Sequence, residues 1–153
     1  MEIERKWLVD TAKCPIYHEN YVILAEDVWR TVQGYLNTIK DEWLIRVRSI
    51  NDERFFLELK TQGLLAREEL SFKIHKDEFN QTLEKCVSKV EKTRYCYYTD
   101  NVKYEIDIFL DHSFVTCEVE FGNEETANAF KAPDWCTKDV TYDPAYKNVN
   151  LAK

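Results

Sequence analysis

Charged residues of like sign recur two positions apart along segments that otherwise have the composition of β-strands. The N-terminal segment, EIERKWLV, places Glu2, Glu4 and Lys6 on one face of such a strand. Ile3 and Trp7 alternate with them and form an apolar face. Residues two apart on a strand lie roughly 6.5–7 Å from each other, so like charges repel unless groups of opposite sign lie between them. The pattern therefore predicts a sheet with one charged face and one apolar face.

The same alternation continues through the chain. Pairs of like charge occur at Arg46 and Arg48, Lys92 and Arg94, Glu105 and Asp107, and Glu118 and Glu120. Mixed charges occupy equivalent positions at Glu58, Lys60, Arg67, Glu69 and Lys73. For any single strand, a solvated face is the simpler interpretation. Taken together, paired carboxylates require cations and paired basic residues require anions, so the set favours a site for a polyanion that carries a divalent cation.

The spacing of these segments predicts a mainly β (α+β) fold. Strands are expected at about 2–9, 28–38, 42–50, 54–61, 67–75, 89–98, 101–110 and 114–122. Helices are expected over 75–87 and 123–131, with a third within 14–26 and a short terminal one over 143–152. Short links favour a closed eight-stranded antiparallel barrel with a few covering helices, and an open sandwich is the alternative.

A barrel of this kind would have charged residues in its lumen and apolar residues outside. Long charged side chains around a ligand can occupy such a lumen, because buried charges must be paired or coordinate a metal. The helices would then cover the apolar outer face. The chain has 153 residues, which is enough for one domain with a real core, and we expect a single domain over 1–153.

The amino-acid composition bears on whether the chain binds nucleic acid or a membrane. The formal net charge of -7 disfavours general nucleic-acid binding, although a local basic pocket remains compatible with it. No apolar run approaches the roughly 18–20 residues that span a membrane, and the charged N-terminus differs from a signal peptide. We therefore expect a cytoplasmic protein that binds neither nucleic acid nor membrane.

Several residue types with characteristic site motifs lack those motifs here. The five cysteines form no C-x-x-C pair, so free thiols in a reducing compartment are expected, and the three scattered histidines predict no zinc site. No glycine-rich phosphate loop is present, so phosphates would be bound by side chains. The four tryptophans, Trp7, Trp29, Trp43 and Trp135, are expected in the core or the barrel cover rather than in base stacking.

Seven short motifs occur in one order along the chain. They are Glu2, Glu4 and Lys6 in EIERK, Gln33-Gly34-Tyr35-Leu36, Arg46-Val47-Arg48, Glu58-Leu59-Lys60, Lys92-Thr93-Arg94-Tyr95, Glu105-Ile106-Asp107 and Glu118-Val119-Glu120. With these motifs and the tail DVTYDPAYKNVNLA, the chain resembles the CYTH domain proteins, also called triphosphate tunnel metalloenzymes. The family often has R-x-E-x-E after the fourth strand-like segment, whereas this chain has Arg67, Glu69 and then Ser71.

The resemblance implies an eight-stranded antiparallel tunnel in which glutamates hold Mg²⁺ or Mn²⁺ and basic residues hold a triphosphate. Hard cations prefer carboxylate oxygens. The expected metal ligands are Glu2, Glu4, Glu118, Glu120 and Asp107. The expected substrate-binding residues are Lys6, Arg46, Arg48, Lys60, Lys73, Lys92 and Arg94. Glu118 and Glu120, with Lys6, are the expected catalytic residues. The alternative role of Asp107 is a salt bridge instead of metal binding. The alternative for Lys73 is a surface position instead of substrate binding.

The resemblance also implies the reaction. We expect a divalent-metal-dependent triphosphatase that hydrolyses inorganic tripolyphosphate, with possible lesser activity on nucleoside triphosphates, by attack of metal-activated water on the terminal phosphate. Adenylate cyclisation and thiamine triphosphate hydrolysis on the same scaffold are alternatives, and so is a non-catalytic polyphosphate- or nucleotide-binding module. The number of metal ions, the effect of Ser71 and the choice between monomer and homodimer stay open.

Overall fold

The strands of the computed structural model curve into a barrel whose order differs from their order in the chain. The structure describes residues 1–19, 21–22, 24–37 and 42–153. Among these, the main sheet has 10 strands. They are β1 (Glu2–Val9), β4 (Asp27–Tyr35), β5 (Trp43–Ile50), β6 (Arg54–Thr61), β7 (Ala66–Arg67), β8 (Glu69–Lys73), β9 (Ser88–Thr99), β10 (Val102–Phe109), β11 (Val115–Glu120) and β12 (Cys136–Asp139). The order is β12-β1-β11-β10-β9-β4-β5-β6-β8, and neighbouring strands are antiparallel.

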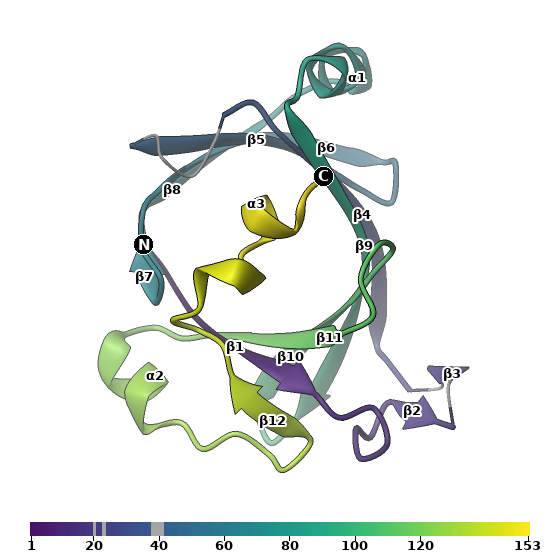
Figure 1. The fold of residues 1–153 in the computed structure, drawn as a ribbon, viewed down its shortest axis with the longest axis vertical. Coiled ribbons are helices and arrows are strands. Elements are labelled where there is room, and N and C mark those ends of the chain that lie inside the picture. Colours follow the sequence, from purple (N-terminus) through teal and green to yellow (C-terminus); the bar gives the residue numbers. More distant parts are fainter. Residues whose placement is uncertain (20, 23, 38–41) are drawn as a thin grey trace.

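One short segment, residues 66–73, closes the ring. Its first part, β7, pairs with β1, so that Arg67 lies opposite Glu2. Its second part, β8, pairs with β6 over five positions, from Glu69 opposite Lys60 to Lys73 opposite Phe56. Because β1 also pairs with β11 on its other edge, the strands form the ring seen in Figure 1. The predicted antiparallel barrel is therefore confirmed.

The predicted elements differ from the observed ones in three places. The predicted strand over 67–75 is divided into β7 and β8, and β12 was not predicted. The helix predicted within 14–26 is wrong, because the structure has β2 (Tyr17–His18) paired with β3 (Tyr21–Val22) there. Pro15 disfavours helix at the preceding residue, and the next side chain, Ile16, is fully buried. Residues 20 and 23, and residue 38 at the end of the strand predicted over 28–38, lie outside the described residues.

The described helices lie outside or across the barrel rather than within its wall. They are α1 (Lys76–Glu84), α2 (Glu124–Ala129), the 3₁₀ helix η1 (Pro144–Tyr146) and α3 (Asn148–Leu151). None of these helices has the length and apolar content of a membrane span. Phe79 of α1 packs on Val47 and Phe55 of the outer face, with 5.3 Å between the Phe55 and Phe79 ring centroids. The helix therefore covers part of the apolar outer face, as predicted.

The C-terminal segment occupies one end of the barrel interior. At that end, inward-facing positions of four strands are apolar: Tyr35, Leu44, Val90 and Phe109. Val149 and Leu151 of the C-terminal segment pack against them. Figure 1 shows this segment in the centre of the ring, and Lys153 pairs with Lys89 of β9 through two backbone hydrogen bonds. The segment thus fills one end of the lumen, and the charged residues lie farther along the same strands.

Candidate active site

The inward-facing charged residues line one cavity of about 480 Å³. Glu2 and Glu4 of β1 form part of its wall. The other charged residues that line it are Arg46, Arg48, Lys60, Arg67, Glu69, Lys92, Arg94, Lys103, Glu105, Glu118 and Glu120. The alternation along each strand therefore does place the charged face inside the barrel.

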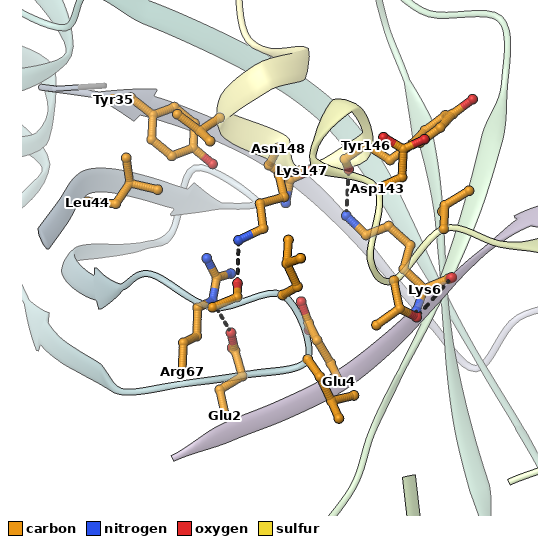
Figure 2. A pocket seen from close by; sticks show the side chains of 16 residues that line it. Glu2, Glu4, Lys6, Tyr35, Leu44, Arg67, Asp143, Tyr146, Lys147 and Asn148 are labelled. Atoms are coloured by element: carbon orange, nitrogen blue, oxygen red, sulfur yellow. Dashed lines mark hydrogen bonds and ion pairs between the residues drawn. The ribbon is translucent and has the colours of Figure 1, made fainter. Parts of the chain in front are cut away.

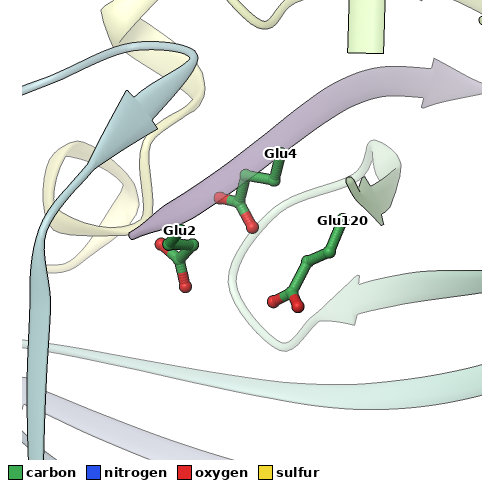
Figure 3. A group of neighbouring side chains, drawn as sticks. All are labelled: Glu2, Glu4 and Glu120. Atoms are coloured by element: carbon green, nitrogen blue, oxygen red, sulfur yellow. The ribbon is translucent and has the colours of Figure 1, made fainter. Parts of the chain in front are cut away.

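Three carboxylates of β1 and β11 converge in this cavity. One oxygen from each of Glu2, Glu4 and Glu120 lies within 4.8 Å of the other two. The register of the two strands explains the approach, since Glu4 lies directly opposite Glu120. Figure 3 shows the three side chains directed toward one another. We call Glu2, Glu4 and Glu120 the acidic cluster.

The charge environment differs within the acidic cluster. Glu2 accepts from Lys60 at 3.1 Å and from Arg67 at 3.0 Å, and although burial opposes it, these cations hold the pKa of Glu2 well below its usual range. Glu4 is different: burial, followed by the charges of Glu118 and Glu2, raises its pKa to about 8. Burial and neighbouring carboxylates also raise the pKa of Glu120.

Two other carboxylates are bound between basic side chains. Glu58, which is 1% exposed, accepts from Arg46 at 3.0 Å and from Arg48 at 3.1 Å. Asp107, which is fully buried, accepts from Lys92 at 2.8 Å and from Arg94 at 2.8 Å. We call Glu58 and Asp107 the paired carboxylates.

The pKa values of the paired carboxylates follow from these contacts. Burial alone would raise both values, but Arg46 and Arg48 outweigh it and lower the pKa of Glu58 to about 2. Arg94 and Lys92 likewise lower the pKa of Asp107. Both groups are therefore ionised and fix the orientation of two basic side chains each.

Arg94 is the most extensively paired cation of the site. Its guanidinium contacts Asp107, Glu105 at 2.7 Å and Glu118 at 3.0 Å. Arg48 is paired less completely, because its Nε atom is buried and has no hydrogen-bond partner among the described residues. A buried unsatisfied N–H is costly, so this atom is suited to donate to an anion in the cavity.

Lys6 connects the site to the C-terminal segment. Its Nζ lies 3.1 Å from Glu118 Oε1 and donates to the carbonyl of Tyr146 at 2.8 Å. Lys147, the next residue of the segment, donates to the carbonyl of Gly63. Figure 2 shows both lysines beside Glu2, Glu4 and Arg67 in a small pocket that adjoins the main cavity. The C-terminal segment is thus bonded to two walls of the barrel.

Most of the residues predicted for the site lie together, and three have different surroundings from those expected. Glu118 lines the cavity but pairs with Lys6 and Arg94 rather than joining the acidic cluster. Asp107 lies behind the cavity wall, where both of its oxygens accept from cations, so the salt-bridge alternative describes it better. Lys73 is exposed at the end of β8 and does not line the cavity.

Several charged residues of the site were assigned no role from the sequence. They include Glu58, Arg67, Glu69 and Lys103, which occupy inward-facing positions. Their alternation with apolar residues was visible in the sequence, but their partners depend on strand register. Burial and the neighbouring carboxylates raise the pKa of Glu69 to about 7, although Lys60 opposes this shift.

Comparison with known proteins agrees with this arrangement. The model of the CYTH domain matches residues 1–139. The chain belongs to the CYTH domain family. An inorganic triphosphatase from Nitrosomonas europaea is 37% identical over 155 residues, which cover 99% of this chain and 96% of that protein. An inorganic triphosphatase from Acetivibrio thermocellus is 35% identical over 156 residues, covering 99% and 93% of the two chains.

Solved structures share the CYTH fold. The crystal structure of an inorganic triphosphatase superposes with a TM-score of 0.68 at 33% identity and covers 99% of this chain and 94% of that one. A putative adenylate cyclase from Bacillus halodurans superposes with a TM-score of 0.63 at 20% identity, covering 84% of each chain. At that identity, the second likeness concerns the fold alone.

Proposed function

We propose that this CYTH-family protein hydrolyses inorganic triphosphate with the aid of a divalent cation, Mg²⁺ or Mn²⁺. The observation that carries the proposal is the acidic cluster facing a set of basic side chains across one cavity. The curated relatives named inorganic triphosphatase support the same substrate class. A pure anion-binding module would have no need for three converging carboxylates.

The chemistry of the acidic cluster suits a hard divalent cation. Oxygen ligands are those that Mg²⁺ and Mn²⁺ prefer, and the cluster offers one from each of Glu2, Glu4 and Glu120. The raised pKa of Glu4 reflects burial and crowding with other carboxylates, which a bound cation would relieve. A cation held there would polarise a phosphate oxygen and lower the pKa of an attacking water.

The basic side chains bind and orient the phosphate chain. Arg46 and Arg48 are fixed by Glu58, and Lys92 and Arg94 are fixed by Asp107. Fixed donors cost little reorganisation when charge develops on a transferring phosphoryl group, and this is a large part of phosphoryl-transfer catalysis. The free Nε of Arg48 provides one donor that no carboxylate occupies.

Lys6 contributes a positive charge that persists at neutral pH. Burial by itself would lower its pKa, but the carboxylates of Glu118 and Glu4 outweigh burial and raise it. Lys6 is therefore an ammonium group that donates hydrogen bonds and cannot serve as a base. We assign it to charge stabilisation at the phosphate next to the acidic cluster.

A phosphate-release assay tests the proposal. Wild-type protein should hydrolyse tripolyphosphate with Mg²⁺ or Mn²⁺ and should be inactive in excess EDTA. Glu120→Gln should lower kcat by about tenfold to a hundredfold or more. Losses of that size are typical even for residues that only support the ligands of a metal. Glu125→Gln is the matched control, because it removes the same charge from an exposed position in α2.

Two results would contradict the proposal. Full activity in EDTA would exclude the metal requirement. Equal loss of kcat in Glu120→Gln and Glu125→Gln would show that general charge, and not the acidic cluster, matters.

A further inference from the structure

The strand β8 lies at one end of the main sheet and has an open edge. In the order of the strands, β12 and β8 are the two ends, and within the described part of the chain β8 pairs along one edge only, with β6. The ring closes through β7, so residues 69–73 lie beyond the pairing with β1. An end strand presents a row of backbone N–H and C=O groups to which another strand can bind.

The backbone hydrogen bonds next to β8 show which of its groups point to the open edge. The N–H of Thr61 donates to the carbonyl of Glu68 at 3.0 Å, and the N–H of Ile74 donates to the carbonyl of Phe55 at 3.0 Å. Bonded and non-bonded positions alternate along an antiparallel pair. The backbone N–H and C=O groups of residues 69, 71 and 73 therefore point away from β6.

The side chains of β8 include two exposed apolar groups. Leu70 is 50% exposed and Phe72 is 52% exposed. Both belong to the apolar outer face of the barrel, because Leu70 lies opposite Leu59 and Phe72 lies opposite Leu57. The apolar outer face therefore reaches the open edge of β8, where half of each of these two side chains is accessible to solvent.

The other end strand, β12, differs from β8. Its last three residues, Thr137, Lys138 and Asp139, are polar and exposed. Asp139 is paired with Arg5 at 2.6 Å. Charged residues, lysine above all, on an edge strand disfavour pairing with another chain. Of the two end strands, β8 is therefore the one suited to a partner strand.

The sequence of β8 is complementary to itself in an antiparallel pair. The strand reads Glu69-Leu70-Ser71-Phe72-Lys73. Around a two-fold axis at Ser71, Glu69 lies opposite the partner's Lys73, and Leu70 lies opposite the partner's Phe72. Pairs of opposite charge and pairs of an aromatic with an aliphatic residue both stabilise neighbouring strands. In this register, the bonded positions are 69, 71 and 73, which are those whose backbone groups point to the open edge.

We propose that the open edge of β8 binds a second copy of this chain, so that two barrels form a two-fold dimer with one continuous sheet. Such an interface is isologous, because the same residues contribute from both copies. The partner's Lys73 would lie beside Glu69, which lines the cavity of the candidate site. A strand of 5 residues forms a small interface, so we expect a dimer whose population depends on protein concentration.

Sedimentation velocity at increasing protein concentration tests the dimer without substrate, so the result is independent of the proposed function. The wild type should change from monomer to dimer as the concentration rises. Ser71→Pro removes an N–H that points to the open edge and leaves the bonds to β6 in place, so the Kd of the dimer should rise by at least about tenfold. A wild type that stays monomeric at every concentration would overturn the proposal. The melting temperature of dilute Ser71→Pro shows whether the barrel is folded.

Two charge reversals test the same register without proline. Glu69→Lys and Lys73→Glu each place like charges opposite each other twice, so each variant alone should dimerise about tenfold more weakly than the wild type. An equimolar mixture of the two variants restores opposite charges at both positions, and a heterodimer of about wild-type affinity should form.

Lys138→Glu is the matched control for Lys73→Glu. It makes the same reversal at an exposed position of the other end strand and should dimerise as the wild type does. A dimer as strong in Lys73→Glu as in Lys138→Glu would place the interface elsewhere and overturn the pairing of β8. So would a mixture of Glu69→Lys and Lys73→Glu that associates no more strongly than either variant alone.

Discussion

Glu4 and Glu120 of the acidic cluster occupy an electrostatic environment opposite to that of the paired carboxylates. Asp107 and Glu58 each accept from two basic side chains, and their pKa values are lowered. Glu4 lies among carboxylates, and its pKa is raised to about 8. The paired carboxylates are neutralised by basic side chains, whereas Glu4 is crowded by other carboxylates.

Strand register explains the difference. Arg46 lies opposite Glu58, and Asp107 lies opposite Arg94, so unlike charges meet across each pair of strands. Glu4 lies opposite Glu120, so like charges meet at β1 and β11. Opposite charges across a pair stabilise a sheet and like charges destabilise it. The comparison teaches that identical spacing along a strand yields a structural ion pair or a cluster of carboxylates according to the neighbouring strand.

Replacing a paired carboxylate should give the largest change in the stability of the fold. Asp107→Asn leaves Lys92 and Arg94 buried with less compensation, and breaking a buried ion pair typically costs about 3–5 kcal/mol. For a chain of this size, we expect the melting temperature to fall by about 10 °C. Urea unfolding in EDTA provides the free energy of unfolding without any bound metal.

Asp111→Asn is the control for this variant. Asp111 is exposed in the link between β10 and β11, so its replacement should change stability by no more than about 0.5 kcal/mol. A loss in Asp107→Asn that is no larger than in the control would contradict the description of Asp107 as a structural ion pair.

Replacing Glu4 of the acidic cluster should change the free energy of unfolding in the opposite direction. Glu4→Gln replaces a carboxyl that must take up a proton on folding because its pKa is raised, and in EDTA near pH 7.5 we expect the variant to raise the free energy of unfolding by about 1–2 kcal/mol, after allowance for solvent screening. Glu91→Gln, on the exposed side of β9, is the control and should have little effect. Destabilisation by Glu4→Gln in EDTA would remove the distinction between the two groups.

The same carboxyls predict a pH dependence of the metal-free protein. A carboxyl whose pKa is raised on folding contributes stability that is fully present below about pH 4.5 and is lost as the pH rises through its folded value. Glu4, at about 8, and Glu69, at about 7, both act in this direction. The lowered values of Glu58 and Asp107 contribute constant stability above pH 4.5.

Thermal melts in EDTA should therefore show a falling melting temperature from about pH 5 to about pH 7.5. The range ends below about pH 8, the value to which burial and neighbouring cations lower the pKa of Lys60 and of Lys147, because proton loss from these lysines acts on stability in the opposite direction. Glu4→Gln should flatten the curve, leaving the part due to Glu69 and Glu120, whose pKa values are also raised. Equal slopes for the wild type and Glu4→Gln would contradict the raised pKa of Glu4.

Much of the barrel was predictable because a period of two is a local property of the chain. The eight predicted strands and the inward position of residues such as Arg46 follow from alternation alone. Closure by residues 66–73 was not predictable, since a single stretch pairs with both β1 and β6. The hairpin within 14–26 was also missed, because its formation depends on burial of Ile16 against the outer face.

The candidate site was predictable as a set of residues but not as a set of contacts. Like-charged pairs identified the acidic and basic positions, yet the sequence does not state which strand lies beside which. Asp107 therefore joined the expected metal ligands, although the structure places it between Lys92 and Arg94. Trp29, which was expected in the core or the barrel cover, lines the cavity opposite Arg94, because its inward position is a matter of register.

The smallest expected effect concerns the position where the chain departs from the R-x-E-x-E pattern. Ser71 lies opposite Glu58 and lines a second cavity together with Glu2, Glu69 and Glu120. Ser71→Glu adds a carboxylate near the acidic cluster. If the new carboxylate lies roughly 6–7 Å from a cation held by the acidic cluster, its attraction through a water-like dielectric should tighten Mn²⁺ binding by about fivefold.

Phe72→Glu is the matched control for Ser71→Glu. It adds the same charge one residue along β8, on a side chain that is 52% exposed and faces away from the cavity. Mn²⁺ titrations followed by calorimetry should show tighter binding in Ser71→Glu only. Equal tightening in both variants would indicate a general effect of net charge. Unchanged affinity in Ser71→Glu would place the cation too far from β8, on the side of the cluster formed by Glu4 and Glu120.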